Sequence, residues 1–340
     1  MDMKEIRAAA RERLKGYCKV CPVCNGVACA GEVPGMGGAL TGSSFKANVE
    51  DLGKVKVRLK TIHDAKNPDM TFDFFGTRLD FPLMSAPITG TSVNMGGALL
   101  EEMYIESVVN GSVDAGTIAM IGDSANPVFY EIGLETLKKV NGKGVAIIKP
   151  KENKVVIDLV KKAEEANAIA VGMDIDGAGL VTMALQGYPV GPKTVDELKE
   201  IISSTNLPFI LKGIMTKEEA LLAVEVGAKA IVVSNHGGRV LDSTQSTAKA
   251  LYEIADAVKG KIMILVDGGV RSGVDVFKML ALGADAVLIG RPIVIGAVGG
   301  YREGVAKVLN DMKNQLLQTM ILTGAKDLAS INKSMISIEW

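Results

Sequence analysis

The sequence predicts an α/β protein, a single (β/α)₈ TIM barrel preceded by a short cysteine-rich extension. From Phe81 onward, short apolar runs alternate with amphipathic stretches about eight times, and alternating strands and helices build parallel sheets. The later apolar runs are continuous Val, Ile and Ala segments without polar alternation, as in parallel strands buried on both faces. Eight such units favour a closed barrel over an open doubly wound sheet, and a chain of 340 residues suits one barrel.

The expected elements follow in chain order. Residues 1–45 hold an N-terminal helix and the cysteine-rich segment, and 46–340 form the barrel, with a hairpin at 71–80 that plugs its lower end. Strands are expected at 82–86, 116–121, 145–149, 168–174, 208–212, 230–234, 262–267 and 286–289. Helices are expected at 154–166, 195–203, 217–226, 246–258, 274–282 and, last, 301–323. Thr194, Thr216 and Ser272 stand directly before three of these helices, as N-cap residues do.

The bulk composition narrows the class of function. The formal net charge is −1 and aromatic residues make up 4% of the chain, which gives no reason to expect nucleic acid or a membrane surface as a partner. The N-terminus lacks the apolar core of a secretion signal, and no apolar run approaches the roughly 20 residues that cross a bilayer. We therefore expect a cytoplasmic protein with reduced thiols.

Chemically reactive residues stand where the expected strands end, and barrel enzymes carry their active sites at that face. Glycines after the seventh and eighth strands allow close backbone approach, and phosphate sites of barrels recur there. Arginines in the same loops add charge-assisted bonds. The residues expected at this phosphate site are Asp267, Gly268, Gly269, Arg271, Gly290 and Arg291.

The sixth strand leads into a loop with His236 and Arg239, which can converge on a substrate that carries a carboxylate. A neutral imidazole accepts the proton of an alcohol near pH 7. Asp174, at the end of the fourth strand, is a candidate to hold the ring. Lys212 ends an otherwise apolar strand. An ammonium group at this position would bind an anion or an electron-rich ring, or it would extend to the solvent at the rim of the barrel.

Four runs of sequence together resemble the flavin mononucleotide (FMN)-dependent 2-hydroxy acid oxidases and dehydrogenases, a family that includes glycolate oxidase and lactate oxidase. The resemblance extends over roughly residues 44–336 and is most specific from Lys212 to Pro292, where the Ser-Asn-His-Gly-Gly-Arg run is a strong signal. The four runs are Lys212-Gly213, Ser-Asn-His-Gly-Gly-Arg-Val-Leu-Asp at 234–242, Val-Asp-Gly-Gly-Val-Arg-Ser-Gly at 266–273, and Gly-Arg-Pro at 290–292.

The resemblance implies oxidation of a small L-2-hydroxy acid, similar to lactate or glycolate, to the 2-oxo acid. His236 would remove a proton while a hydride equivalent passes to flavin N5, with Asp174 as its partner. Arg239 would bind the carboxylate and Lys212 would stabilise the reduced flavin. Electrons would go to oxygen or another acceptor such as a redox protein, and the chain would form a homo-oligomer, a tetramer in this family. The further flavin neighbours implied are Pro87, Ile88, Thr89, Gly122 and Ser234.

The chain departs from the family pattern in three places. No arginine follows Asp174 within residues 175–181, where the family carries a second carboxylate-binding arginine. The third strand ends in Lys149 instead of the usual glutamine and tyrosine, so Lys149 is a candidate contact for the flavin or the carboxylate. The usual N-terminal active-site tyrosine has no counterpart. The substrate assignment consequently depends mainly on Arg239.

All four cysteines of the chain, Cys18, Cys21, Cys24 and Cys29, fall within twelve residues. In a reducing compartment, this crowding favours a metal site over disulfides. The first three share the spacing of a bacterial ferredoxin motif, whereas the fourth comes one residue later and lacks the following proline. Four thiolates also suit tetrahedral zinc. We favour an iron–sulfur cluster that takes electrons from the flavin.

Two other functions fit parts of the sequence. Type 2 isopentenyl diphosphate isomerases share the barrel and the flavin site, but His236 and Arg239 would not be expected in them. A non-catalytic flavin or cluster redox sensor would fit the missing second arginine.

Overall fold

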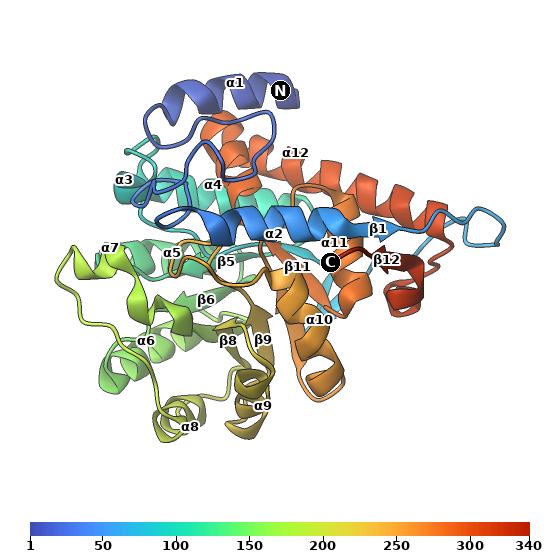
Figure 1. Cartoon of the computed structure of the whole chain (residues 1–340). Coiled ribbons are helices and arrows are strands. Elements are labelled where there is room, and N and C mark those ends of the chain that lie inside the picture. The colour runs from blue at the N-terminus through green and yellow to red at the C-terminus, as the bar shows by residue number, and fades with distance from the viewer.

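The computed structural model describes residues 1–340, apart from the side chain of Val181. Eight parallel strands pair in chain order, and the last closes on the first, so the predicted (β/α)₈ barrel is confirmed (Figure 1). Nearly every strand residue is buried, which explains their continuous apolar sequence. The strands are β4 (Leu83–Ser85), β5 (Ala119–Gly122), β6 (Gly144–Ile148), β7 (Ala170–Asp174), β8 (Phe209–Ile214), β9 (Ala230–Val233), β10 (Met263–Val266) and β11 (Ala286–Ile289).

Helices cover the outside of the barrel, one after each strand. Thr194, Thr216 and Ser272 each accept a backbone N–H through their side-chain oxygen, which confirms the three predicted caps. The outer helices are α4 (Glu101–Asp114), α5 (Pro127–Lys139), α6 (Asn153–Glu165), α8 (Val195–Ser203), α9 (Lys217–Glu225), α10 (Thr247–Val258), α11 (Gly273–Leu282) and α12 (Arg291–Thr323).

The predicted hairpin, β2 (Phe72–Phe74) with β3 (Thr77–Leu79), is also present and antiparallel. Its Phe74 and Leu79 belong to the same buried cluster as interior barrel residues such as Met84 and Leu265. The hairpin therefore closes the end of the barrel at which the strands begin, and leaves the other end for the site.

Helix α12 consists of two helical segments, because the backbone leaves helical geometry at Gly300 and Tyr301. The second segment, which ends at Thr323, matches the helix expected at 301–323. The first segment, which begins at Arg291, was not predicted; Pro292 occupies its first turn, where the missing N–H costs nothing.

The N-terminal extension lies against the mouth of the barrel. Helix α1 (Met3–Arg13) packs on α12 (Figure 1), and Arg13 donates to the carbonyl of Val298. After the cysteine segment, the N–H of Ala39 donates to the carbonyl of Gly238, and α2 (Ser43–Lys54) follows. In the described part of the chain, no helix is both long and apolar enough to span a bilayer.

Candidate active site

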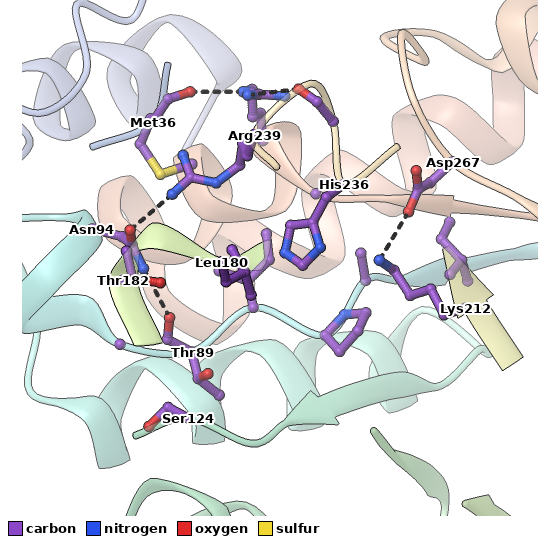
Figure 2. Close-up of a pocket in the computed structure, with 18 of the residues that line it drawn as sticks. Met36, Thr89, Asn94, Ser124, Leu180, Thr182, Lys212, His236, Arg239 and Asp267 are labelled. Carbon is purple, nitrogen blue, oxygen red and sulfur yellow. Dashed lines mark hydrogen bonds and ion pairs between the residues drawn. The ribbon is translucent and has the colours of Figure 1, made fainter. Parts of the chain in front are cut away.

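A large cavity opens where the barrel strands end, with about 1190 Å³ of empty space including its open mouth. It is lined by side chains from the loops after most of the strands and by Met36 of the extension. Figure 2 shows His236 near its centre, between Arg239 on one side and the Lys212–Asp267 pair on the other. The residues predicted from separate strand ends thus meet in one space.

The loop after β9 holds His236 in an unusual backbone conformation. His236, Gly237 and Gly238 have φ values of 58°, 65° and 77°, three successive residues in the left-handed region. A Cβ on Gly238 would lie 2.4 Å from the backbone N of Phe45, so only glycine fits there. The tight loop ties His236 to α2 and aims the imidazole into the cavity.

Two carboxylates face the Nδ1 atom of His236. Asp176 Oδ1 lies at 3.2 Å, within hydrogen-bond distance, and Asp174 Oδ2 lies at 3.6 Å. Asp176 belongs to the short 3₁₀ turn Ile175–Gly179 that follows β7. The sequence prediction named Asp174 alone, although the position of Asp176 two residues beyond a strand end could have signalled it.

Asp174 is fully engaged by two ammonium groups. Its Oδ1 accepts from Lys212 at 2.8 Å, and its Oδ2 forms an ion pair with Lys149. Burial alone would raise the pKa of Asp174, but Lys149 and Lys212 outweigh burial and hold this pKa well below its usual range. Burial does raise the pKa of Asp267, whose nearest ammonium, Lys212, is 3.9 Å away.

Three guanidinium groups gather at the same face without a carboxylate partner among the described residues. Arg239 donates to the carbonyls of Gly35 and Gly37 and, at 2.8 Å, to Asn94 Oδ1. Arg291 donates to the carbonyl of Met36 at 2.8 Å. Burial lowers the pKa of Arg239 to about 10.

Arg271 completes the group of three guanidiniums, and its Nε donates to the carbonyl of Cys24 at 3.1 Å. Burial, with Arg271 and Arg239 close by, lowers the pKa of Arg291 to about 9. The three side chains are half-buried, and a cation withdrawn from water is costly unless an anion compensates it. The site is therefore built for anionic groups that the chain itself does not supply.

The loop after β10 fits a phosphorylated cofactor. In the described part of the chain, the backbone N–H groups of Gly268 and Gly269 donate no hydrogen bond, and Asp267 Oδ1 and Arg271 Nη2 are buried without a partner. Gly268 and Gly269 have φ of 95° and 79°. Successive free N–H groups beside an arginine form an anion nest, which matches the predicted phosphate site.

Most of the predicted cofactor residues reach the cavity and two do not. The residues that line it are Pro87, Ile88, Thr89, Lys212, Asp267, Gly268, Gly269, Arg271, Gly290 and Arg291, together with Lys149. Ser234 is fully buried behind the wall, where its hydroxyl accepts the N–H of His236 at 3.1 Å. Gly122 packs behind Thr89, whose Cγ2 lies 3.3 Å from the position of an added Cβ.

All four cysteines line one smaller cavity of the extension. Met36 and Arg291 belong to the walls of both this cavity and the large one, so the two spaces share a boundary. Among the described side chains, no three of the sulfurs lie within 4.8 Å of one another. Burial raises the pKa of the Cys18 and Cys29 thiols.

A closed parallel barrel with an anion nest after its seventh strand and a histidine after its sixth is the architecture of the flavin-binding barrel class of enzymes. The family model of the FMN-dependent dehydrogenases matches residues 35–182 and 181–338. The chain belongs to the FMN-dependent dehydrogenase family, as its motifs predicted.

Relatives of known function cover nearly the whole chain. A peroxisomal (S)-2-hydroxyacid oxidase of Arabidopsis thaliana is 31% identical over 338 residues, which cover 89% of this chain and 90% of that protein. Glycolate oxidase of Spinacia oleracea is 32% identical over 336 residues, with 86% and 87% covered. A crystal structure of mandelate oxidase with benzoyl-formic acid superimposes with a TM-score of 0.79 and 28% identity, covering 99% and 97% of the chains.

Proposed function

We propose that the chain oxidises a small L-2-hydroxy acid, similar to lactate or glycolate, to the corresponding 2-oxo acid with FMN as cofactor. The observation that carries this proposal is the convergence of His236, Arg239 and Lys212 on one cavity beside the phosphate nest. Relatives named for 2-hydroxy acid and glycolate oxidation support the substrate class.

Each side chain has a distinct task in this reaction. Arg239 binds the carboxylate, because its half-buried guanidinium lies at the cavity wall and its Nε makes no hydrogen bond within the described residues. His236 takes the hydroxyl proton through Nε2, since Nδ1 faces Asp176. FMN, which the loops with Gly268, Gly269 and Arg291 would hold, would supply the two-electron acceptor for the substrate's α-hydrogen. Lys212 supplies the fixed positive charge that stabilises the reduced ring.

Lys149 partly replaces the missing second arginine. It lines the cavity, and its side chain is 12% exposed beside Asp174. An ammonium here adds positive charge for the substrate carboxylate, but as a point charge it cannot bind both oxygens in the planar manner of arginine. We therefore place the main carboxylate contact at Arg239.

Anaerobic bleaching of the flavin tests the proposal. The FMN-loaded protein is mixed with lactate, glycolate and larger 2-hydroxy acids, and flavin absorbance is followed. We expect at least one acid to bleach the wild type, His236→Ala to lose bleaching while it keeps FMN, and Arg239→Met to need a much higher acid concentration. Absence of bleaching across the panel would overturn the assignment and favour a redox sensor.

The isomerase alternative has less support in the site. A substrate with a diphosphate has no evident need of a histidine base and a buried arginine on one loop, whereas a hydroxy acid needs both. Formation of the 2-oxo acid in the same anaerobic mixture distinguishes net oxidation from isomerisation.

The proposal includes an iron–sulfur cluster on Cys18, Cys21, Cys24 and Cys29 as the electron exit. Oxidation of R–CHOH–COO⁻ gives R–CO–COO⁻, two protons and two electrons, and a cluster passes electrons on singly to an acceptor such as a redox protein. The wall that Met36 and Arg291 share supports this electron exit, because it puts the cysteine cavity directly beside the large cavity that His236 lines. Oxygen is the alternative acceptor.

The spacing along the sequence favours a cluster over zinc. Cys18, Cys21 and Cys24 share the spacing of a bacterial ferredoxin motif. The wall is mostly apolar, with Val20, Val294 and Ile295, and this excludes water from the site.

Metal analysis tests the cluster without reference to activity. Protein purified anaerobically is assayed for iron, acid-labile sulfide and zinc, and its visible absorbance is compared with that of Cys24→Ser. We expect iron and sulfide in the wild type only. Stoichiometric zinc without iron would overturn the cluster.

The proposed location of the protein is the cytoplasm, where thiols stay reduced. The proposed assembly is a homo-oligomer, a tetramer by resemblance to the family.

A further inference from the structure

Six charged side chains surround the imidazole of His236, and both lysines among them form ion pairs with the same aspartate. The two ammonium groups, of Lys149 and Lys212, both bind Asp174. The remaining groups are Arg239 on the same loop, Asp267 after β10, and Asp176 after β7. Asp176 is thus the carboxylate next to the imidazole that has no lysine within ion-pair distance among the described residues.

The position of Asp176 is fixed by close packing against β8. Gly213 has φ of 103°, and a Cβ added to it would lie 2.8 Å from Asp176 Cβ. The aspartate is therefore pressed against a bulge in β8 at Lys212 to Ile214. One oxygen, Oδ1, meets His236 Nδ1 at 3.2 Å, and the other, Oδ2, is buried without a hydrogen-bond partner.

We propose that Asp176, rather than Asp174, is the residue that positions His236 for catalysis. Asp176 accepts the Nδ1–H of the imidazole, which leaves the Nε2 lone pair free to take the substrate's hydroxyl proton. After proton transfer, the same carboxylate compensates the imidazolium, whereas the charge of Asp174 is already compensated twice. Asp174 serves to hold Lys149 and Lys212 in place. This inference rests on the proposed role of His236 as the base.

The tautomer of the imidazole gives a readout that does not depend on turnover. The chain has two histidines, so ¹⁵N NMR of histidine-labelled, FMN-loaded protein is readily assigned with a His63→Gln variant. His63 accepts the N–H of Ala65 through Nδ1 at 3.1 Å and so serves as an internal Nε2–H reference. We expect wild-type His236 to be protonated at Nδ1.

Asp176→Asn is the decisive variant, because its amide can donate to Nδ1 and favour the wrong tautomer. We expect His236 to move to the Nε2–H form, and the anaerobic bleaching rate to fall by about 100-fold or more. The acid limb of the rate should also move to lower pH, since the imidazolium loses its counterion. Asp176→Glu keeps a carboxylate and should recover part of both the tautomer and the rate.

Two comparison variants make the result specific. Asp158→Asn, an exposed change on α6, should alter nothing, and Asp174→Asn should leave His236 in the Nδ1–H form. The inference is overturned if Asp176→Asn keeps the wild-type tautomer and rate, or if Asp174→Asn rather than Asp176→Asn changes the tautomer. If no acid bleaches the wild type, the proposed reaction fails, while the tautomer still decides which aspartate holds the ring.

Discussion

At the scale of single residues, the mouth of the barrel buries charges of both signs at close range. Asp174 is 1% exposed, and Lys212 is 3% exposed beside it. The strand-end rule predicted that His236, Arg239 and Lys212 would meet, because parallel strands deliver their last residues to one face. It could not assign the partners of Asp174 or find Asp176, since a difference of a few tenths of an ångström decides which atoms pair.

Asp174→Asn should strongly destabilise the fold, because it removes the buried carboxylate that compensates the ammonium groups of Lys149 and Lys212. We expect a loss of about 3–5 kcal/mol in the free energy of unfolding, measured by urea denaturation against Asp158→Asn as control. The depressed pKa of Asp174 makes its contribution fully present above the ordinary carboxyl pKa of 3.8 and lost only well below it. The difference between wild type and variant should therefore be flat from pH 5 to pH 8; a marked decrease over that range would contradict this account.

At the scale of elements, the cysteine segment and the loops of the barrel mouth hold each other in place. Carbonyls of Cys24, Gly35, Met36 and Gly37 accept hydrogen bonds from the three arginines of the site. The sequence indicated a metal-binding extension and an arginine-rich mouth as separate features. Their contact was not predictable, because it joins residues more than 200 positions apart.

Loss of the proposed metal centre should consequently weaken the binding of a carboxylate. In Cys29→Ser, we expect no bound metal and at least about tenfold weaker binding of oxalate, a small anionic probe, because the backbone that holds Arg239 is no longer fixed; tenfold corresponds to about 1.4 kcal/mol. Isothermal titration of the FMN-loaded protein measures this. Val23→Ala, an exposed change in the same segment, is the control. Metal loss with unchanged oxalate affinity would show that the segment does not position Arg239.

At the scale of the whole molecule, the apolar residues that stabilise the barrel at its closed end lie apart from the charged residues of the cavity. The hairpin β2–β3 fills one end with apolar side chains, and the charged cavity occupies the other. The strand positions, the caps and the hairpin were predictable because local sequence periodicity specifies them. The first segment of α12, before the kink at Gly300, was not predictable, because its glycine-rich sequence resembles a loop.

Phe74→Ala tests this separation. Phe74 is fully buried in the plug, so its truncation should cost about 3–5 kcal/mol of stability. The affinity for FMN and the bleaching rate at 25 °C should stay within about twofold of wild type, since the plug lies at the opposite end from the cavity. Val128→Ala, an exposed change on α5, provides the reference. A selective loss of FMN affinity in Phe74→Ala would show that the two ends are coupled.

By itself, the sequence determined the barrel, the glycine-rich loops after its seventh and eighth strands, the histidine and arginine of the mouth, and the four-cysteine motif. Periodicity and strand-end position are local signals, and a closed barrel turns them into a common site. Only the tertiary structure decided that Asp176 faces His236 and that two lysines share Asp174. It also decided that the cysteine cavity adjoins the large cavity through Met36 and Arg291. These features depend on which atoms approach within hydrogen-bond distance after distant segments pack, and no local pattern encodes that distance.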